Sequence, residues 1–348
     1  MHQIAVAGHL CLDIVPRLWS TAAFDPGRLL EVGPIAISPG GSVANTGGAL
    51  AGLGAEVTPF ASIGNDELGT LLRAQLSTEG FSHPHLSTSS VLTTSYSLVI
   101  EAPGTDRTLW HHTGANNEFD GTQVDVDGQG LVHVGYPPLL PGVLTDGGRP
   151  LLKLLARARA AGATSSLDLA VVDPNSDVGA LDWASILGSV FAECDIASPS
   201  LDDLTSALQI NEPYSAALVS RLADWMLTCG VAVAAISAGR HGLHVRTASA
   251  DRLRVGGAML APLAESWGDR SLTVPPLRVD SPVTTNGAGD ASTAGLLFAI
   301  SRGSTVEQAA ALAAACSAAI MSGSRPTPAV VTALDHSLNT LFASREDT

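Results

Sequence analysis

Short apolar runs alternate with longer segments of helical period along most of this chain. The runs have the length and composition of buried strands, and the longer segments repeat with the period of a helix. We therefore expect strands at 4–15, 57–63, 130–136, 164–172, 194–197 and 231–237. Helices are expected at 39–53, 64–79, 147–161, 182–190, from 200 onward, and at 213–229, 287–301, 305–321 and 327–341. This order predicts an α/β fold whose mainly parallel central sheet carries helices on both faces.

Two segments depart from this alternation. Residues 93–101 alternate apolar and polar side chains, turn at 103–106 and return through 107–110, which predicts an antiparallel hairpin and a candidate lid. Residues 251–283 contain four prolines and are expected to be irregular and loop-like. Since no internal repeat or low-complexity linker divides the chain, we expect a single unit.

The composition is that of a folded protein, because 45% of its 348 residues are hydrophobic and only 15% are charged. A net charge of -15 argues against a nucleic-acid surface, which needs clustered Lys and Arg. Lys153, the only lysine, lies between leucines in a helical pattern, and this excludes a Gly-Lys-Ser/Thr phosphate loop. No apolar run has the length of a membrane span and no export pattern precedes the first strand, so we expect a cytoplasmic protein without a membrane partner.

Cysteine and histidine spacing gives no sign of a metal site. The cysteines lie far apart, form no Cys-x-x-Cys pair and are expected to be reduced and mostly buried; they are Cys11, Cys194, Cys229 and Cys316. The histidine pairs His111–His112 and His83-x-His85 lack a carboxylate or cysteine at ligand spacing. We interpret these histidines as exposed lid and loop residues.

Candidate chemistry gathers at 284–290, Thr-Thr-Asn-Gly-Ala-Gly-Asp, directly before an apolar helical run. Alternate glycines let successive N–H groups point one way, and a helix N-terminus with converging amides is an anion site. Asp290 would lie beside that anion, where a carboxylate can take a proton from an alcohol during phosphoryl transfer. Asp is also a favoured residue at helix starts, so these residues equally fit a capped glycine loop. Both interpretations remain open from these residues alone.

Several polar side chains fall at the expected carboxyl ends of strands, the edge of a parallel sheet where ligands bind. They are Asp13, Asp168, Ser200, Ser237 and Asp290. Asn45 adds a polar group one turn into the helix that follows Pro39, on a face otherwise made of glycine and alanine. Their coincidence predicts a ligand site at this edge of the sheet.

Together these residues resemble the ribokinase or PfkB family of carbohydrate kinases over nearly the whole chain. The family's C-terminal signature, Asp-Thr-x-Gly-Ala-Gly-Asp, corresponds to residues 284–290, and its N-terminal signature corresponds to 40–45. Residues 64–69 and 106–108 also stand at the expected spacing. Each motif is short, and their shared order carries the resemblance.

The resemblance implies a single unit over 1–348, a ribokinase-like three-layer α/β/α sandwich with a small β-sheet lid. The core would comprise 1–12, 39–90 and 116–348, and the lid 13–38 and 91–115. Such a lid closes over the substrate and excludes water. A homodimer through exposed lid strands is also expected, since an unpaired sheet edge tends to find a partner.

The resemblance also implies roles for individual residues. Asp290 would be the general base that activates a sugar hydroxyl, and the amides of Gly287, Ala288 and Gly289 would form the anion hole. Residues implied in substrate binding are Asp13, Gly41, Ser42, Asn45 and Arg107. Residues implied in ATP binding are Ser200, Ser237, Gly239, Gly242 and Asn286. Asp203 would order Mg²⁺ through a water molecule.

Three positions depart from the family pattern. Thr284 replaces the first Asp of the signature, which leaves the use of a monovalent cation such as K⁺ open. Ser200-x-x-Asp203 replaces the Asn-x-x-Glu motif that orders magnesium and phosphate. Gly135–Tyr136 stands where ribose-specific members place a glutamate, which argues against ribose as the substrate.

Three functions fit this sequence. The first is ATP-dependent phosphoryl transfer to a hydroxymethyl group of a carbohydrate, which we favour. The second keeps the chemistry but takes a nucleoside, for which Trp19, Phe24 and Trp110 could supply an aromatic platform. The third is a catalytically weak sugar-binding or regulatory protein on the kinase fold, suggested by Thr284 and Ser200-x-x-Asp203.

Overall fold

The computed structural model describes residues 3–20, 26–81, 84–102 and 107–342. Its larger sheet has nine strands in the order β13-β12-β11-β10-β9-β8-β1-β4-β5. All neighbours from β11 to β5 are parallel, and β12 and β13 add an antiparallel edge. The strands are β1 (Gln3–Gly8), β4 (Val57–Gly64), β5 (His85–Ser89), β8 (Gln129–Gly135), β9 (Thr164–Asp168), β10 (Ile196–Ala197), β11 (Val233–Ser237), β12 (Leu243–Thr247) and β13 (Ser271–Val274). The predicted mainly parallel sheet is confirmed.

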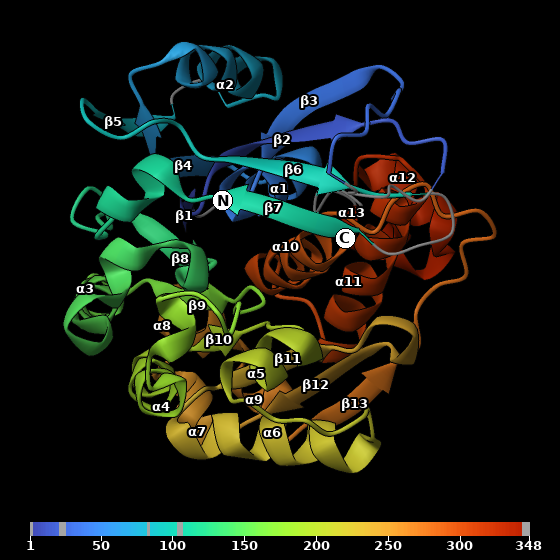
Figure 1. Cartoon of the computed structure of the whole chain (residues 1–348). Helices are drawn as coiled ribbons and strands as arrows, with labels where there is room; N and C mark the ends of the chain where they lie inside the picture. The colour runs from blue at the N-terminus through green and yellow to red at the C-terminus, as the bar shows by residue number, and fades with distance from the viewer. Residues whose placement is uncertain (1–2, 21–25, 82–83, 103–106, 343–348) are drawn as a thin grey trace.

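Helices cover both faces of this sheet and form the outer two of three layers (Figure 1). Successive side chains of a strand alternate between faces, so on β1 Ile4 and Val6 enter one core while Ala5 and Ala7 enter the other. The first core is closed by α1 (Ser42–Gly52), α2 (Glu67–Thr78), α10 (Ala288–Ser301) and α11 (Val306–Met321). The second is closed by α3 (Pro141–Ala160), α4 (Trp183–Glu193), α5 (Leu201–Ala207) and α6 (Ala216–Cys229).

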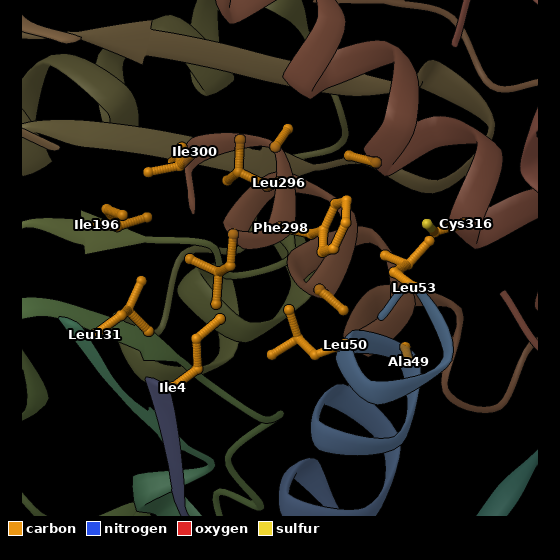
Figure 2. Packing of buried hydrophobic residues seen from close by; sticks show 14 of the residues in the cluster. Ile4, Ala49, Leu50, Leu53, Leu131, Ile196, Leu296, Phe298, Ile300 and Cys316 are labelled. Carbon is orange, nitrogen blue, oxygen red and sulfur yellow. The ribbon is translucent and has the colours of Figure 1, made fainter. Parts of the chain in front are cut away.

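Helix α10 lies in the middle of the first core. Its side chains are apolar or small on every side and are buried from Asp290 to Ile300, which is typical of a helix enclosed by protein. Figure 2 shows strand residues and helix residues meeting in this core, among them Ile4, Leu131, Ile196, Leu50 and Leu296. Each such side chain contributes about 1.5–3 kcal/mol when fully buried, so the start of α10 is firmly positioned.

A second, smaller sheet has the order β3-β2-β6-β7. Its strands are β2 (Cys11–Pro16), β3 (Ile35–Gly40), β6 (Tyr96–Ile100) and β7 (Thr108–His112). Strands β6 and β7 form the predicted antiparallel hairpin, whose turn at 103–106 lies outside the described residues. Strand β2 pairs with β3 antiparallel and with β6 parallel, so the sheet is built from distant pieces of the chain. The division into core and lid segments remains a prediction.

The first strand differs from the prediction, because the chain breaks at His9 and Leu10 into β1 and β2, which belong to different sheets. Gly8 there has a φ of 122°, and a Cβ at Gly8 would lie 2.5 Å from the carbonyl oxygen of Gly135. Only glycine fits such a turn. Asp13 is therefore carried by the smaller sheet and not by the end of a strand in the larger one.

The prediction that 251–283 is loop-like is wrong for 251–274 and is confirmed for 275–283. The segment contains α7 (Ala250–Arg254), α8 (Gly257–Leu260), the 3-10 helix η5 (Ala261–Leu263), α9 (Ala264–Trp267) and β13. These elements are too short to show a period, although they bury Leu253, Leu260 and Trp267. Strand β12, which pairs with β11, was also missed.

Strands β3 and β5 were not predicted either, and the C-terminal helix differs from the prediction. The expected helix at 327–341 is divided into α12 (Pro328–Leu334), η6 (His336–Leu338) and α13 (Asn339–Phe342), because Asp335 is extended and its carboxylate accepts a hydrogen bond from Ser337 N. The remaining 3-10 helices are η1 (Gly114–Glu118), η2 (Pro137–Leu139), η3 (Val178–Ala180) and η4 (Gly239–His241). All the cysteines are free, and only Cys229 is partly exposed, as expected. Within the described ranges, no helix is long and apolar enough to cross a membrane.

Candidate active site

Asp290 is the third residue of α10 and is only 3% exposed. Its carboxylate does not cap its own helix, whose N-cap is the left-handed Gly287 and which has no side-chain cap. Three side chains from other elements donate to it instead. Tyr136 Oη and Asn45 Nδ2 donate to Oδ2 at 2.6 and 3.1 Å, and Thr46 Oγ1 donates to Oδ1 at 2.9 Å. The carboxylate therefore points toward α1 and the end of β8, which does not fit the capped-loop interpretation.

The environment of Asp290 acts on its ionisation in two directions. Burial raises the pKa of the carboxyl above its usual value, and the nearby Asp13 adds to this. The bonds from Tyr136, Thr46 and Asn45 lower the pKa, because a donor stabilises the charged form. The net direction is upward, so the three donors oppose the effect of burial without cancelling it.

Asp13 lies on β2, is 7% exposed and faces the loop before α10. Its Oδ2 accepts from Asn286 Nδ2 at 2.9 Å, and its Oδ1 accepts from Cys11 Sγ at 3.4 Å. A Cβ at Gly40 would collide with the Asp13 carboxylate, so glycine is needed there. Burial raises the pKa of Asp13, and these two bonds oppose the rise. Asn286, assigned above to ATP binding, thus contacts the implied substrate residue Asp13.

Two further contacts shape the loop at 284–287. Thr284 Oγ1 accepts from Asn286 N at 3.0 Å, so the residue that replaces the first signature Asp stabilises a local turn. Arg107 Nη1 donates to Thr285 Oγ1 at 2.6 Å. The charge of the same guanidinium lowers the pKa of Asp13, so Arg107 lies on the side of the loop that faces Asp13.

A pair of histidines that was not predicted adjoins this group. His9 Nε2 lies 3.2 Å from His111 Nε2, and His111 Nδ1 lies 3.0 Å from Ser97 Oγ. Burial lowers the pKa of both rings, that of His111 to about 4, so both are neutral at physiological pH. The interpretation of His111 as an exposed lid residue is therefore wrong, because strand alternation turns it to the same face as Asp13 and Ser97.

Gly41 and Ser42 open helix α1 beside this group. Gly41 is its N-cap with a φ of 83°, and a Cβ there would lie 2.5 Å from Nδ1 of His9. Ser42 is fully buried, with its Oγ 3.3 Å from His133 Nε2. A Cβ at Gly135 would collide with this hydroxyl. The Ser42 side chain therefore packs on β8 and not toward solvent.

The residues implied in ATP binding lie at the carboxyl ends of β10 and β11. Ser200 and Ser237 form a parallel bridge, and Ser237 lines a small pocket with Gly289 and Thr293. A Cβ at Gly289 would meet no atom within 4 Å, so space is open above the first turn of α10. The glycines that follow Ser237, Gly239 and Gly242, have left-handed φ values of 51° and 89°.

Asp203 and Asp168 are two further buried carboxylates near this pocket. Asp203 Oδ2 accepts from Ser200 N at 2.8 Å, and Ser200 Oγ accepts from Asp203 N at 3.0 Å, which is a capping box on α5. Asp168 Oδ2 accepts from Thr293 Oγ1 at 3.3 Å. Burial raises the pKa of both carboxyls, that of Asp203 to about 6. Within the described part of the chain, no three His, Cys, Asp or Glu side chains form a ready metal site.

The sequence model of the pfkB family carbohydrate kinase matches residues 1–332. The chain belongs to the pfkB family of carbohydrate kinases. It is therefore a phosphotransferase with an alcohol group as acceptor. Among curated proteins, no sequence matches this chain.

Solved structures of sugar and nucleoside kinases share the fold. Ribokinase from Thermotoga maritima has a TM-score of 0.71 and 19% identity, with 96% of this chain and 99% of that chain covered. Arabidopsis thaliana ribokinase complexed with ribose and ATP has a TM-score of 0.72 and 18% identity, with 99% of each chain covered. The nucleoside kinase of Burkholderia thailandensis in complex with inosine has a TM-score of 0.67 and 17% identity, with 98% of this chain and 99% of that chain covered. The predicted ribokinase-like fold is confirmed.

In this pfkB kinase the residues predicted from the sequence form two groups. The first consists of two hydrogen-bonded pairs, Asn286 with Asp13 and Asn45 with Asp290. The second contains Ser200, Asp203, Ser237, Gly239 and Gly242 at the strand ends. Gly287 and Gly289 lie between them, since Gly287 faces Asn45 and Gly289 lines the pocket with Ser237. The individual roles of these residues remain predictions.

Three residues of the site were missed by sequence reasoning. Tyr136 ends the strand predicted at 130–136, so the rule of polar side chains at strand ends could have included it. Thr46 follows Asn45 directly. Nothing in the sequence indicated a role for His9, because its position in the site depends on the break between β1 and β2.

Proposed function

We propose that this pfkB kinase transfers the γ-phosphoryl group of ATP to a hydroxymethyl group of a small carbohydrate, with Asp290 as general base. The observation that carries the proposal is the carboxylate of Asp290, buried at the first turn of α10 and held there by three donors from other elements. A carboxylate in this place accepts the proton of an alcohol while the amides of the same turn face the phosphoryl group.

The first turn of α10 is suited to the transferring phosphoryl. It has no side-chain cap and follows the left-handed Gly287, and of its amides Ala288 N makes a long hydrogen bond of 3.3 Å to Thr285 O. The helix is 14 residues long, so its N-terminal partial positive charge also favours an anion. The amides at Gly287, Ala288 and Gly289 would stabilise the phosphoryl charge as it develops.

The other end of the acceptor would be held by polar groups of the smaller sheet. Asp13, Asn286 and Asn45 offer a carboxylate and two amides, a set that hydrogen-bonds polyol hydroxyls well. Arg107 lies beside them, and His9 and His111 are neutral. These groups recognise hydroxyls by hydrogen bonds and provide no broad apolar slot, which supports a sugar.

A nucleoside is the alternative acceptor, but its suggested platform is poorly placed. Trp110 is 46% exposed and comes one residue before His111 on β7. Since alternate residues of a strand face opposite ways, Trp110 projects from the face opposite to His111 and Asp13. Trp19 is 59% exposed, and Phe24 lies outside the described residues. We therefore include nucleosides among the acceptors to be assayed.

The carboxylates near the ATP pocket fit Mg²⁺, which prefers oxygen ligands and retains water. Asp203 uses Oδ2 in its capping box and would order a metal-bound water with Oδ1, and Ser237, Gly239 and Gly242 would line the phosphates. Bound Mg²⁺ would neutralise phosphate charge during transfer. Thr284 supplies no charge for a monovalent cation, so K⁺ is varied separately in the assay.

The test is a panel of sugars, sugar acids, polyols and nucleosides with ATP and Mg²⁺, read as ADP release with and without KCl. The wild type should phosphorylate a carbohydrate, and Asp290→Asn should bind it yet lose kcat by about 10³-fold. Asp280→Asn, which removes an exposed carboxylate, is the matched control. Full turnover by Asp290→Asn would refute the proposal. Tight sugar binding in calorimetry with no ADP formed would favour a regulatory protein.

We also propose a homodimer through the smaller sheet. Apolar side chains are exposed on and beside it, including Trp19, Ile35, Leu109 and Trp110. Strands β3 and β7 leave edges without a neighbour in the sheet order, and such edges favour association. Light scattering after size exclusion should give twice the chain mass, and Ile35→Arg should shift it to monomer. A monomer at assay concentration in the wild type would end this proposal.

A further inference from the structure

Tyr136 follows β8 in a conformation that a tyrosine rarely adopts. Its φ of 66° and ψ of 50° are left-handed, a region that bulky side chains avoid. The backbone is held on both sides, since Tyr136 N donates to Asp168 O at 3.1 Å and Tyr136 O accepts from Leu139 N at 2.8 Å. Conformations of this kind persist where the direction of a side chain matters.

That direction brings the phenol to the proposed base. Tyr136 Oη donates to Asp290 Oδ2 at 2.6 Å, and Oδ2 also accepts from Asn45. A carboxylate has about four acceptor positions, two on each oxygen. Among the described residues only Thr46 donates to Oδ1, so the remaining acceptor position lies on that oxygen. An alcohol that reaches Asp290 without displacing a donor must therefore bind Oδ1.

We propose that Tyr136 is a positioning residue for the phosphoryl transfer, whose hydroxyl holds Oδ2 of Asp290 and thereby directs the acceptor alcohol to Oδ1. The inference rests on the proposed function. In the transfer the alcohol proton passes to Oδ1, the alcohol oxygen bonds to the γ-phosphorus, and the bond from that phosphorus to the bridging oxygen of ADP breaks. Tyr136 keeps its own proton throughout.

The surrounding charges agree with this role. Burial raises the pKa of the Tyr136 hydroxyl well above its usual value, and Asp290, Asp168 and Asp203 raise it further, so the phenol remains a donor. The same hydrogen bond lowers the pKa of Asp290. The titratable groups that face Asp290 are Asp13 and Cys11 on β2, Asp168 at the end of β9 and Asp203 on α5. All are acidic groups, so the three donors, together with the N-terminal partial positive charge of α10, favour the ionised base.

In the alternative role, the phenol of Tyr136 occupies the position on Asp290 that the substrate hydroxyl takes, and it is displaced when substrate binds. The two roles predict different kinetics for Tyr136→Phe, which keeps the ring and removes the hydroxyl. If Tyr136 positions the base, kcat should fall about ten-fold and KM for the acceptor should change little. If the phenol is displaced, KM should fall and kcat should hold, which would overturn the proposal.

The pH dependence of kcat distinguishes the two possibilities. It should change if Tyr136 acts on Asp290 and should not change if Tyr136 only stabilises the fold. Asp290 must be ionised to act as a base, so kcat rises with pH through its pKa. Removing the donor raises that pKa, and the acid limb of the kcat profile of Tyr136→Phe should move to higher pH. A lower kcat with an unmoved limb would overturn the proposal. Tyr96→Phe, which removes a phenol hydroxyl on β6 outside the site, is the control and should match the wild type.

A double variant gives a second test of whether Tyr136 acts through Asp290. If Tyr136 acts through Asp290, the pair Tyr136→Phe and Asp290→Asn should have the kcat of Asp290→Asn alone. Additive losses would overturn this inference and leave the proposed function standing. Full turnover of Asp290→Asn alone would instead refute the proposed function. Thermal unfolding of each variant, compared with the wild type, separates loss of folded protein from loss of kcat.

Discussion

Asp203 and Asp290 occupy the same position in two different helices, yet their carboxylates do different things. Each is the third residue, of α5 and α10 respectively. Asp203 turns back to the backbone of Ser200 and closes a capping box. Asp290 turns away from its helix and accepts from three side chains of other elements.

The residue before each helix explains the difference. Ser200 has a hydroxyl that accepts from the third amide, and Asp203 completes the reciprocal pair. Gly287 has no side chain and is left-handed, so the first turn of α10 keeps its amides free of a side-chain cap. In this chain the carboxylate at the third helical position turns back to the cap where the N-cap residue can pair with it, and turns to other elements where it cannot.

The largest expected contrast is in turnover. Asp290→Asn should lower kcat by about 10³-fold, because the base is lost, whereas Asp203→Asn should lower it by less than about ten-fold and raise the Mg²⁺ concentration needed. Initial rates with the best acceptor of the panel, over a range of Mg²⁺, measure both. Equal losses of kcat in the two variants would contradict the assignment of Asp290 as the base and of Asp203 as a cap residue.

A smaller effect is expected from the third buried carboxylate, Asp168. Burial raises its pKa in the folded chain, so its stabilising contribution is present below the usual carboxyl pKa and is lost as pH rises. Asp168→Asn should therefore be more stable than the wild type by about 1–2 kcal/mol at neutral pH, where the unfolded chain carries the charge that the buried site disfavours. Urea unfolding at neutral pH and near about pH 4 measures this difference, which should vanish in acid. An equal difference at both pH values would contradict it.

The smallest effect is expected at the cap itself. Ser200→Ala removes one half of the capping box and should cost about 1 kcal/mol of the free energy of unfolding. Ser200→Thr keeps a hydroxyl acceptor and serves as the control. Both are measured by urea unfolding at neutral pH. A loss of stability in the threonine variant as large as in the alanine variant would show that the hydrogen bond to Asp203 N does not matter.

Sequence reasoning found what is local or strongly periodic. The parallel strands and α10 were predicted because their apolar runs are long, and Asp290 because its glycine loop is short and distinctive. The elements α7 to α9 were missed because each is only one turn long. Ser200 was predicted from the sequence as the N-cap of the helix that starts there, and α5 has this cap, completed by Asp203 as a capping box.

The rest of the site depends on contacts that no local pattern encodes. Tyr136 and Asp290 are 154 positions apart, and they meet because β8 ends beside the start of α10. His9 and His111 are 102 positions apart and meet through the register of the smaller sheet. The break after Gly8 decides which sheet carries Asp13. This break could not be predicted, because the need for glycine there comes from the close approach of Gly135, which is distant in the sequence.

The break at His9 and Leu10 also bears on how the protein folds. Strand β2 pairs with β6 through contacts such as Leu12 with Tyr96, which are far apart in the chain, whereas the hairpin of β6 and β7 is local. Because distant pairings bear the cost of closing long loops before any contact stabilises them, we expect the smaller sheet to assemble late. Asp13 then reaches Asn286 only in the last stage, so the acceptor side of the site is completed after α10 and the larger sheet are in place.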